Sequence, residues 1–485
     1  MRRILLVALV ALLFCLPAAA AELDGNPYAT YSNNIRGLSM YQRPTFEVDS
    51  VIDGRALGIG KWNEPADVAV DPEGNVYVLD SNNDRIVVLN PDLTLSRVLD
   101  NFVYEGATLS FKKALGMFVS ADHELLIADT ENQRVIVATL DQQVKEVLTL
   151  PDSDVIPEGF QFRPKAVIKD KKGFTYVLSD GSFYGALVFS QDNTFFGFFG
   201  SNPTEPDLLS NVVRVVKNFF IDDTNVRVQK LPYQFTNLCI DSEDILYSLT
   251  AVTQNNMGEI RKLSPGGDNV LRYVRYIDSE SADYFNFGDG AGYKLMTGEG
   301  RSTVFSDISV DSTGLIFALD QTYGKVFIYD QNCNSLSIFG TGLGQGTQEG
   351  SFVLPVAMVN HGDDVLVLDK NKNSLTVFKP TPIMAQIREA TVLDQKGEYQ
   401  QALPLWEDIL SQDRNFRVAY NGVAKALYEQ GDMQGSMEYA RIGGDRGTYA
   451  QAFAEVRSDF IGANFWWILL LCAALIGGVV FLVVY

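Results

Sequence analysis

Side chains that bind transition metals are scarce in this chain of 485 residues. Two histidines occur, His123 and His361, and each lies between two strand-like runs where a turn is expected. Zinc sites need several histidine, cysteine or carboxylate groups that converge on one point. Cys239 and Cys333 lie in different segments and could form at most one disulfide. The sequence therefore predicts neither a zinc site nor a disulfide framework, and we assign no catalytic residue and no metal ligand.

Aspartates offer a second kind of chemistry, because carboxylate oxygens are the ligands that calcium prefers. The candidates are Asp67, Asp241, Asp307 and Asp311. Asp241 and Asp311, like Asp71, end a strand-like run before a turn, where an aspartate side chain caps the turn. Asp67 and Asp307 instead begin such a run. The matching positions elsewhere hold Ala166, Thr236 and Met358 or their neighbours. We therefore expect no cofactor and keep calcium as an alternative.

A set of basic, aromatic and polar residues precedes several strand-like runs and suggests a binding surface. Its members are Lys61, Trp62, Lys112, Lys113, Arg163, Lys165, Tyr233 and Gln234. The set contrasts with the whole chain, whose 39 basic and 60 acidic residues give a formal charge of −21. A surface of that sign repels phosphate backbones, so we expect no nucleic-acid partner. The local set predicts instead an anionic or carbohydrate-like ligand.

A repeated unit must position these residues. It is clearest in residues 65–89, where two runs of alternating apolar residues flank Pro-Glu-Gly-Asn, which supplies the residues of a tight turn. Six copies end their second strand at Asp80, Asp129, Ser179, Leu249, Asp320 and Asp369. The intervals are 49, 50, 70, 71 and 49 residues. The period is near fifty, and insertions at residues 200–231 and 278–303 account for the two long intervals.

A fourth strand follows most of the units, which makes each unit a four-stranded blade. The sixth unit lacks this strand, whereas residues 46–52 form a strand-like run that belongs to no unit. If this early run completes the last blade, the ring closes and leaves no exposed sheet edge between its first and last blades. We therefore predict a six-bladed β-propeller over residues 46–380.

The residues Asp80, Asn83 and Arg85, repeated as Asp129, Asn132 and Arg134, resemble the NHL repeat family. The resemblance implies the propeller fold. It leaves function open, because members of the family include scaffolds, receptors, lactonase-like hydrolases and metal lyases. The recurrence of these polar residues at fixed offsets favours a structural role in turns and contacts between blades.

The two ends of the chain predict export and membrane anchoring. Residues 1–21 read as a signal peptide, with Arg2 and Arg3 before an apolar run, and residues 22–45 form a lead segment. An apolar run begins at Phe465 and has Tyr485 as its last residue, which is about 31 Å as a helix. We therefore expect a single-pass protein of the bacterial cell membrane, with the propeller and the helical segment that follows it on the extracytoplasmic side, at the cell surface or in the periplasm.

Helical periodicity replaces strand periodicity between residues 383 and 460. Gly397 and Gly431 are 34 residues apart, as are Tyr399 and Met433, and this is the tetratricopeptide period. The segment predicts a small helical domain of the tetratricopeptide type. It could dock a protein partner or simply hold the propeller away from the membrane.

The sequence thus predicts a mainly β protein, with a six-bladed propeller, an all-α domain and one transmembrane helix. We expect it to bind rather than to catalyse: the propeller recognises a ligand or protein partner, and the helical domain docks a membrane complex such as a transporter. A metal-dependent lactonase-like hydrolase and a structural spacer or assembly factor are the alternatives. The two insertions are the preferred elements of specificity.

Overall fold

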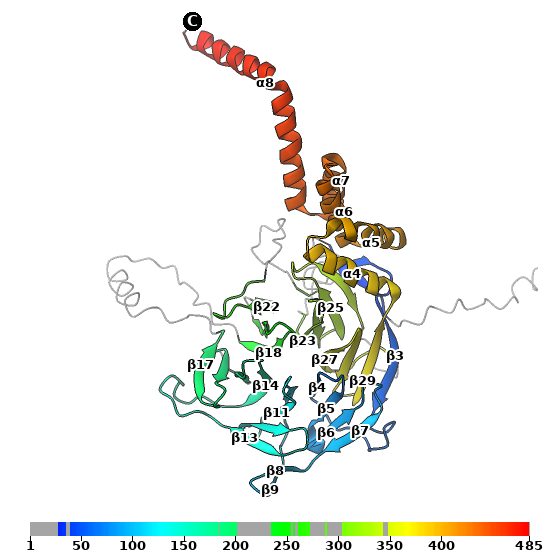
Figure 1. Ribbon diagram of the computed structural model, residues 1–485, viewed down its shortest axis with the longest axis vertical. Helices are drawn as coiled ribbons and strands as arrows, with labels where there is room; N and C mark the ends of the chain where they lie inside the picture. Colours follow the sequence, from blue (N-terminus) through cyan, green and yellow to red (C-terminus); the bar gives the residue numbers. More distant parts are fainter. Residues whose placement is uncertain are drawn as a thin grey trace, which may run out of the picture.

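The computed structural model describes most of the chain between its two ends. The described residues are 28–34, 39–182, 184–200, 234–253, 256–257, 260–271, 287–288, 303–342 and 348–484. The predicted signal peptide 1–21 and most of both insertions lie outside them. Within them the chain forms a six-bladed β-propeller followed by helices, as predicted (Figure 1).

The first three blades are four-stranded antiparallel sheets. Blade one consists of β4 (Asp67–Val70), β5 (Val76–Asp80), β6 (Arg85–Leu89) and β7 (Leu95–Leu99), and the short 3-10 helix η1 (Ser81–Asn83) joins β5 to β6. Blade two consists of β10 (Gly116–Val119), β11 (Glu124–Asp129), β12 (Arg134–Thr139) and β13 (Val144–Leu148). Blade three consists of β14 (Pro164–Lys169), β15 (Thr175–Ser179), β16 (Ala186–Phe189) and β17 (Phe195–Phe199). The hairpin of β8 (Phe102–Tyr104) and β9 (Ala107–Leu109) links blades one and two.

The other three blades follow the same plan with local changes. Blade four shows three strands in its described part, β18 (Phe235–Ile240), β19 (Leu246–Thr250) and β22 (Ile260–Leu263), with a small hairpin of β20 (Val252–Thr253) and β21 (Asn256–Met257). Blade five contains β23 (Phe305–Val310), β24 (Ile316–Asp320), β25 (Lys325–Tyr329) and β26 (Ser335–Phe339). Blade six contains β27 (Pro355–His361), β28 (Asp364–Asp369), β29 (Ser374–Pro380) and β3 (Phe46–Asp53).

Burial between neighbouring blades holds the ring together. Every residue of β5 is buried, because both faces of a blade pack against other blades. An apolar cluster of described residues lies at each of the six blade junctions. The stability of each blade therefore depends on packing against its two neighbours.

The ring closes through β3, the strand that follows the lead segment. β3 pairs with β29 in antiparallel register from Phe46 opposite Pro380 to Asp53 opposite Ser374. Figure 1 shows the blue β3 beside the yellow β29, although more than 300 residues separate them in the chain. The predicted closure is confirmed.

The lead segment adds a feature that the sequence did not predict. β1 (Tyr31–Asn33) and β2 (Ser39–Tyr41) form a hairpin, and β1 pairs with the outermost strand of blade five through Tyr31 opposite Ile338. This hairpin extends blade five to six strands and covers the exposed edge of β26.

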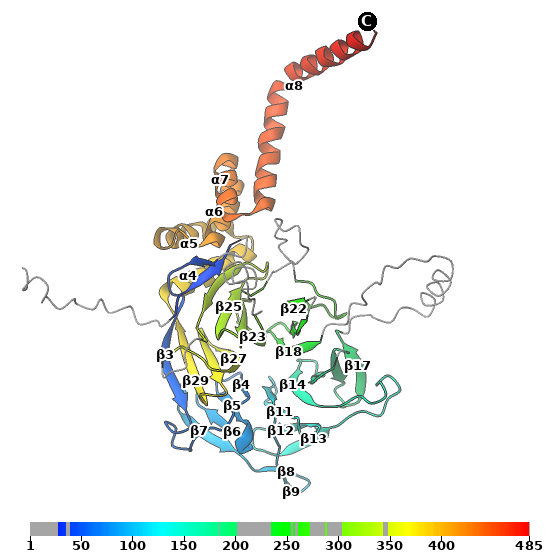
Figure 2. The same ribbon diagram turned by 180° about the vertical axis from the view of Figure 1, so that it is seen from behind.

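Five helices follow the propeller in the described part. They are α4 (Pro382–Gln395), α5 (Tyr399–Gln412), α6 (Arg417–Gln430), α7 (Met433–Gly443) and α8 (Arg446–Val484). α5 and α7 begin at Tyr399 and Met433, the 34-residue spacing noted in the sequence. Gly431 ends α6 with a φ of 83°, a conformation that glycine adopts without strain. Figures 1 and 2 show α8 leading away from the propeller.

The first of these helices belongs to the propeller core. Ile383, Met384 and Ile387 of α4 are buried in the cluster that fills the junction of blades five and six. Trp406 and Phe416 of the following helices lie in the same cluster. The helical domain is therefore packed on the propeller rather than separated from it by a linker.

Phe46 is the side chain on which ring closure and helix packing meet. It is fully buried, and its ring stacks on Phe339 of blade five at 4.8 Å between centroids. We predict that Phe46→Ala destabilises the full chain by about 3–5 kcal/mol, because it opens a cavity at the closing strand. Chemical denaturation in detergent, followed by far-UV circular dichroism, measures the change.

Glu47→Ala on the same strand is the control, because Glu47 is exposed and its loss should change stability by less than about 0.5 kcal/mol. Equal effects of the two substitutions would show that β3 does not close the ring.

Candidate functional site

The strand order gives the propeller two different faces. In an antiparallel blade the turns after the first and third strands lie at one end, and the loops after the second and fourth strands lie at the other. We call the first the turn face. The second, which carries the loops that join successive blades, is the junction face. The predicted ligand residues belong to the loops and strand starts of the junction face.

The junction face presents most of the predicted basic residues to solvent. Lys61, Lys112, Lys113 and Arg163 are exposed, whereas Lys165 and Gln234 are half-buried. Tyr233 lies outside the described residues. Trp62 is 0% exposed and packs in the apolar cluster between blades six and one, so it belongs to the core and not to the ligand surface.

Ion pairs engage part of this positive charge. Lys112 and Lys113 both approach Glu131, with nitrogen-to-oxygen distances of 3.5 and 3.1 Å. Lys165 lies 3.5 Å from a carboxylate oxygen of Asp180, and burial lowers the pKa of Lys165. The set is therefore a series of separate basic groups around the junction face rather than one cluster.

The repeated Asp-x-x-Asn-x-Arg residues position these loops, as predicted. The fully buried carboxylate of Asp80 accepts hydrogen bonds from the Asn63 backbone N–H at 2.7 Å, from Asn83 at 2.8 Å and from Arg85 at 2.8 Å. Asp129 accepts the same three kinds of bond in blade two. Each aspartate thus fixes the loop that enters its own blade.

Blade three replaces this aspartate with Ser179. Its hydroxyl accepts from the Arg163 backbone N–H at 2.8 Å and donates to the Gln161 carbonyl at 2.8 Å. The loop before blade three is therefore held by a neutral group, which leaves its surroundings free of the Asp–Arg pair.

The histidines have structural contacts on the turn face. His123 occupies the left-handed turn position, with a φ of 58°, that Gly74 and Gly173 hold in blades one and three. Its Nδ1 lies 3.4 Å from a carboxylate oxygen of Glu73. The Nε2 of His361, at the end of β27, lies 2.9 Å from the Gly74 carbonyl oxygen and joins blade six to blade one.

The aspartates at the starts of two inner strands lie at matching positions. Asp67 and Asp307 have the same register, and Asn237 holds the equivalent position in blade four. The sequence predicts Thr236 or its neighbour at this position in blade four, and Met358 or its neighbour in blade six. A β-bulge at the start of the inner strands sets the register, so the matching residues are Asn237 and Ala357, while Ala166 matches as expected.

The carboxylates of Asp67 and Asp307 join neighbouring blades by accepting hydrogen bonds from them. Asp67 accepts the Met117 backbone N–H of blade two at 2.7 Å. Asp307 accepts the Met358 backbone N–H of blade six at 2.6 Å and the Asn237 amide at 2.7 Å. The described residues contain no group of three or more histidine, cysteine or carboxylate side chains that could hold a metal ion. The hydrogen bonds favour a structural role for both aspartates.

Burial raises the pKa values of Asp67 and Asp307. It raises the pKa of Asp67 to about 7, and it raises the pKa of Asp307 well above its usual range, where the negative charge of Asp67 adds to the effect. In the unfolded chain both groups have a pKa near about 4. Each group therefore contributes stability that is fully present at low pH and is lost as the pH rises through its raised pKa in the folded protein.

We predict a pH-dependent effect of Asp67→Asn. Asp67 accepts the backbone N–H of Met117 with one carboxylate oxygen and that of Val68 with the other. The single amide oxygen cannot accept both hydrogen bonds, so the variant should be less stable than the wild type at pH 5. The variant lacks the ionisation, however, so the difference in melting temperature should shrink by pH 8. Thermal unfolding of the full chain in detergent at both pH values measures this difference.

Asp49→Asn is the matched control. A hydrogen bond from Lys379 lowers the pKa of Asp49, so this group stays ionised from pH 5 to 8 and the difference from wild type should stay constant. A constant difference for Asp67→Asn as well would contradict the raised pKa.

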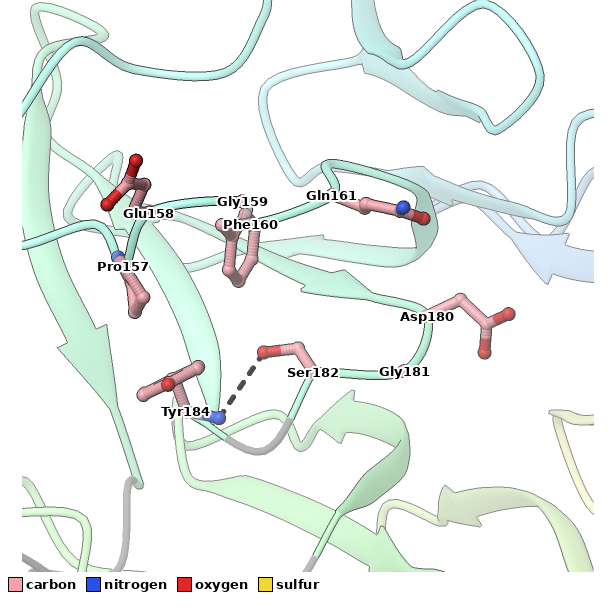
Figure 3. A pocket seen from close by; sticks show the side chains of 9 residues that line it. All are labelled: Pro157, Glu158, Gly159, Phe160, Gln161, Asp180, Gly181, Ser182 and Tyr184. Carbon is pink, nitrogen blue, oxygen red and sulfur yellow. Dashed lines mark hydrogen bonds between the residues drawn. The ribbon is translucent and has the colours of Figure 1, made fainter.

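A hollow on the junction face of blade three was not predicted from the sequence. It has a volume of about 330 Å³ and lies between the loop before β14 and the loop from β15 to β16. Its lining is Pro157, Glu158, Gly159, Phe160, Gln161, Asp180, Gly181, Ser182 and Tyr184 (Figure 3). The sequence signal that could have indicated this hollow is the presence of two aromatic residues, Phe160 and Tyr184, in loops that do not follow the repeat.

Comparisons with known proteins bear on the fold alone. The NHL repeat model matches residues 63–89, which cover most of blade one. The chain is similar to the solved structure of selenomethionine-substituted virginiamycin B lyase from Staphylococcus aureus, with 8% identity and a TM-score of 0.40 over 69% of this chain and 100% of that chain. A streptogramin B lyase structure shares 10% identity, with a TM-score of 0.40 over 70% of this chain and 98% of that chain.

A protein of unknown function from Bacteroides thetaiotaomicron shares 12% identity, with a TM-score of 0.39 over 73% of this chain and 76% of that chain. No curated protein matches the chain. The chain carries an NHL repeat and folds as a six-bladed propeller with a C-terminal helical region. These similarities carry no information on its ligand or activity.

Proposed function

We propose that this protein is a membrane-anchored, extracytoplasmic binding or scaffold protein. Its propeller recognises a ligand or protein partner, and its helical domain docks a membrane complex such as a transporter. The observation that carries the proposal is the division of the propeller into two faces. The helices pack on the turn face, and the loops of the junction face stay available on the opposite side.

A buried ion pair holds the helical domain on the turn face. Arg388 of α4 lies 3.2 Å from a carboxylate oxygen of the buried Asp311 and 3.1 Å from one of the exposed Asp363, both in turns after first strands. Its guanidinium also lies within 6 Å of the ring centroids of Phe46 and Phe317. Removal of Asp311 would leave the buried charge of Arg388 without its buried partner, so the pair favours this one position of α4 on the propeller.

The last helix supports attachment to a membrane. α8 is long and apolar enough to cross one, and its apolar window is not buried within the protein. Asn464 departs from helical geometry, with φ −110° and ψ 15°, and Trp466 and Trp467 lie shortly after it. Tryptophans collect at the boundary between water and lipid, so their place near the start of the apolar run supports a span that begins here. The predicted signal peptide puts the propeller on the extracytoplasmic side.

The helical domain keeps apolar groups exposed above the membrane segment. Tyr449 and Phe453 of α8 stack with parallel rings, and Ile442 at the end of α7 is half exposed. Exposed aromatic groups near an anchor are suited to contact another membrane protein. The domain is therefore the part that we assign to the membrane complex.

Co-purification of the tagged full chain after mild detergent extraction tests the proposal. We expect a membrane protein complex to be recovered in stoichiometric amount, and Phe453→Ser to reduce its recovery at least about fivefold, because it removes half of the exposed aromatic pair. Quantitative mass spectrometry measures the recovery.

Val155→Ser on a propeller loop is the control, since Val155 is 64% exposed and lies far from the helices in the chain. It should leave recovery unchanged. Recovery of the protein alone, from both wild type and variants, would support a structural spacer and contradict the proposed role.

A further inference from the structure

The geometry of the blade-three hollow points to a binding site for a neutral carbohydrate. The inference rests on the proposed function, because it names the ligand class that the junction face takes. It concerns the hollow that residues 157–161 line on one side and residues 180–182 and Tyr184 line on the other (Figure 3).

Two aromatic rings from different loops form one side of the hollow. The Phe160 and Tyr184 rings lie 6.4 Å apart between centroids, and both contact Phe198 of β17 from behind at 6.0 and 5.6 Å. Tyr184 remains 46% exposed although it packs on two rings. The C–H face of a pyranose ring is apolar and slightly positive, so it stacks on the negative face of such aromatic rings.

Hydrogen-bonding groups surround the rings and are not used within the protein. The side chains of Glu158 and Gln161 and the hydroxyl of Tyr184 make no hydrogen bond in the described part of the chain, whereas the Tyr184 backbone N–H donates to Ser182. Figure 3 shows Glu158 and Asp180 at opposite ends of the lining. Carboxylates and amides at the rim of an aromatic platform match the hydroxyl groups at the edge of a sugar ring.

The balance of charge favours a neutral ligand over a cation. Glu158 and Asp180 contribute two negative charges to the lining, but Lys165 pairs with Asp180 at 3.5 Å. Of the charged side chains in the lining, Glu158 alone has no ion pair with a described basic group. One unpaired carboxylate beside two rings gives only a weak attraction for a lysine or quaternary ammonium group, which the aromatic pair could otherwise bind.

Hydrogen bonds to the backbone hold both loops in place. Ser179 binds the first loop through the Gln161 carbonyl, and the buried Ser182 hydroxyl accepts the Tyr184 backbone N–H at 3.3 Å. These bonds limit the movement of Gln161 and Tyr184 in the free protein, which lowers the ordering that binding requires. The volume of about 330 Å³ is at the small end of ligand sites, which suits one sugar ring with its neighbours outside.

Isothermal titration calorimetry on the full chain tests the inference, with maltotetraose, cellotetraose and chitotetraose as probes. The protein is held in a polyoxyethylene detergent, because glycoside detergents present sugar head groups that would compete. We expect at least one tetrasaccharide to bind and Tyr184→Ala to weaken that binding about tenfold or more, since it removes one stacking ring.

Phe196→Ala is the matched control, because Phe196 is an exposed aromatic residue of the same blade that contacts Phe174 and not the hollow. It should change affinity less than about twofold. Glu158→Gln replaces a charged hydrogen-bond acceptor with a neutral one, so sugar binding should weaken by about threefold to tenfold without being abolished.

Three results would overturn the inference. They are a lack of binding by all three tetrasaccharides, equal affinity of Tyr184→Ala and wild type, and preferential binding of a trimethyl-lysine peptide that Glu158→Gln abolishes. Recovery of the membrane complex tests the proposed docking by the helical domain. Loss of sugar binding with that complex retained therefore counts against the carbohydrate site and not against the proposed scaffold role.

Discussion

The pairing of β3 with β29 is the constraint on which the rest of this structure depends. Each blade is apolar on both faces, so it needs a neighbour on either side, and an open ring would leave two of these faces in water. Closure requires residues 46–53 to meet residues 374–380 across the whole length of the propeller. It also brings Phe46 against blade five and under Arg388, so one strand ties the ring and the helical domain together.

Closure also determines where the helices can lie. β29 runs from the junction face to the turn face, and α4 begins two residues after it ends. The helical domain therefore has to start on the turn face, where Asp311 and Asp363 meet Arg388. The covalent order of the chain thus separates the helices, including the apolar α8, from the loops that surround the junction face. This separation supports the proposed binding role, because the helices leave the loops of the junction face uncovered.

The structural features that the sequence predicted correctly recur in several repeats, whereas those that it did not predict each occur once. Alternating strands, turn glycines and the Asp80 set recur at fixed offsets, so six blades and their closure could be recognised without a structure. The β1–β2 hairpin, the burial of Trp62 and the packing of α4 depend on contacts between segments that no repeat relates. The bulges of the inner strands show the same limit at one residue: counting along the chain leaves Thr236 or its neighbour as the match of Asp67, and the strand register identifies the neighbour, Asn237.

Departures from the repeat are where this propeller has room for a specific site. Asp80, Asp129, Asp320 and Asp369 each bind the backbone of the loop entering their blade, and each brings a buried charge to that corner. In blade three the hydroxyl of Ser179 binds the backbone of the entering loop instead. Because this hydroxyl is neutral, it needs no Asn and Arg side chains to balance a buried charge. The loops beside it carry Phe160 and Tyr184 instead. A corner freed from the repeated ion pair can hold aromatic groups at the surface, and it is at this corner of the described junction face that the hollow lies.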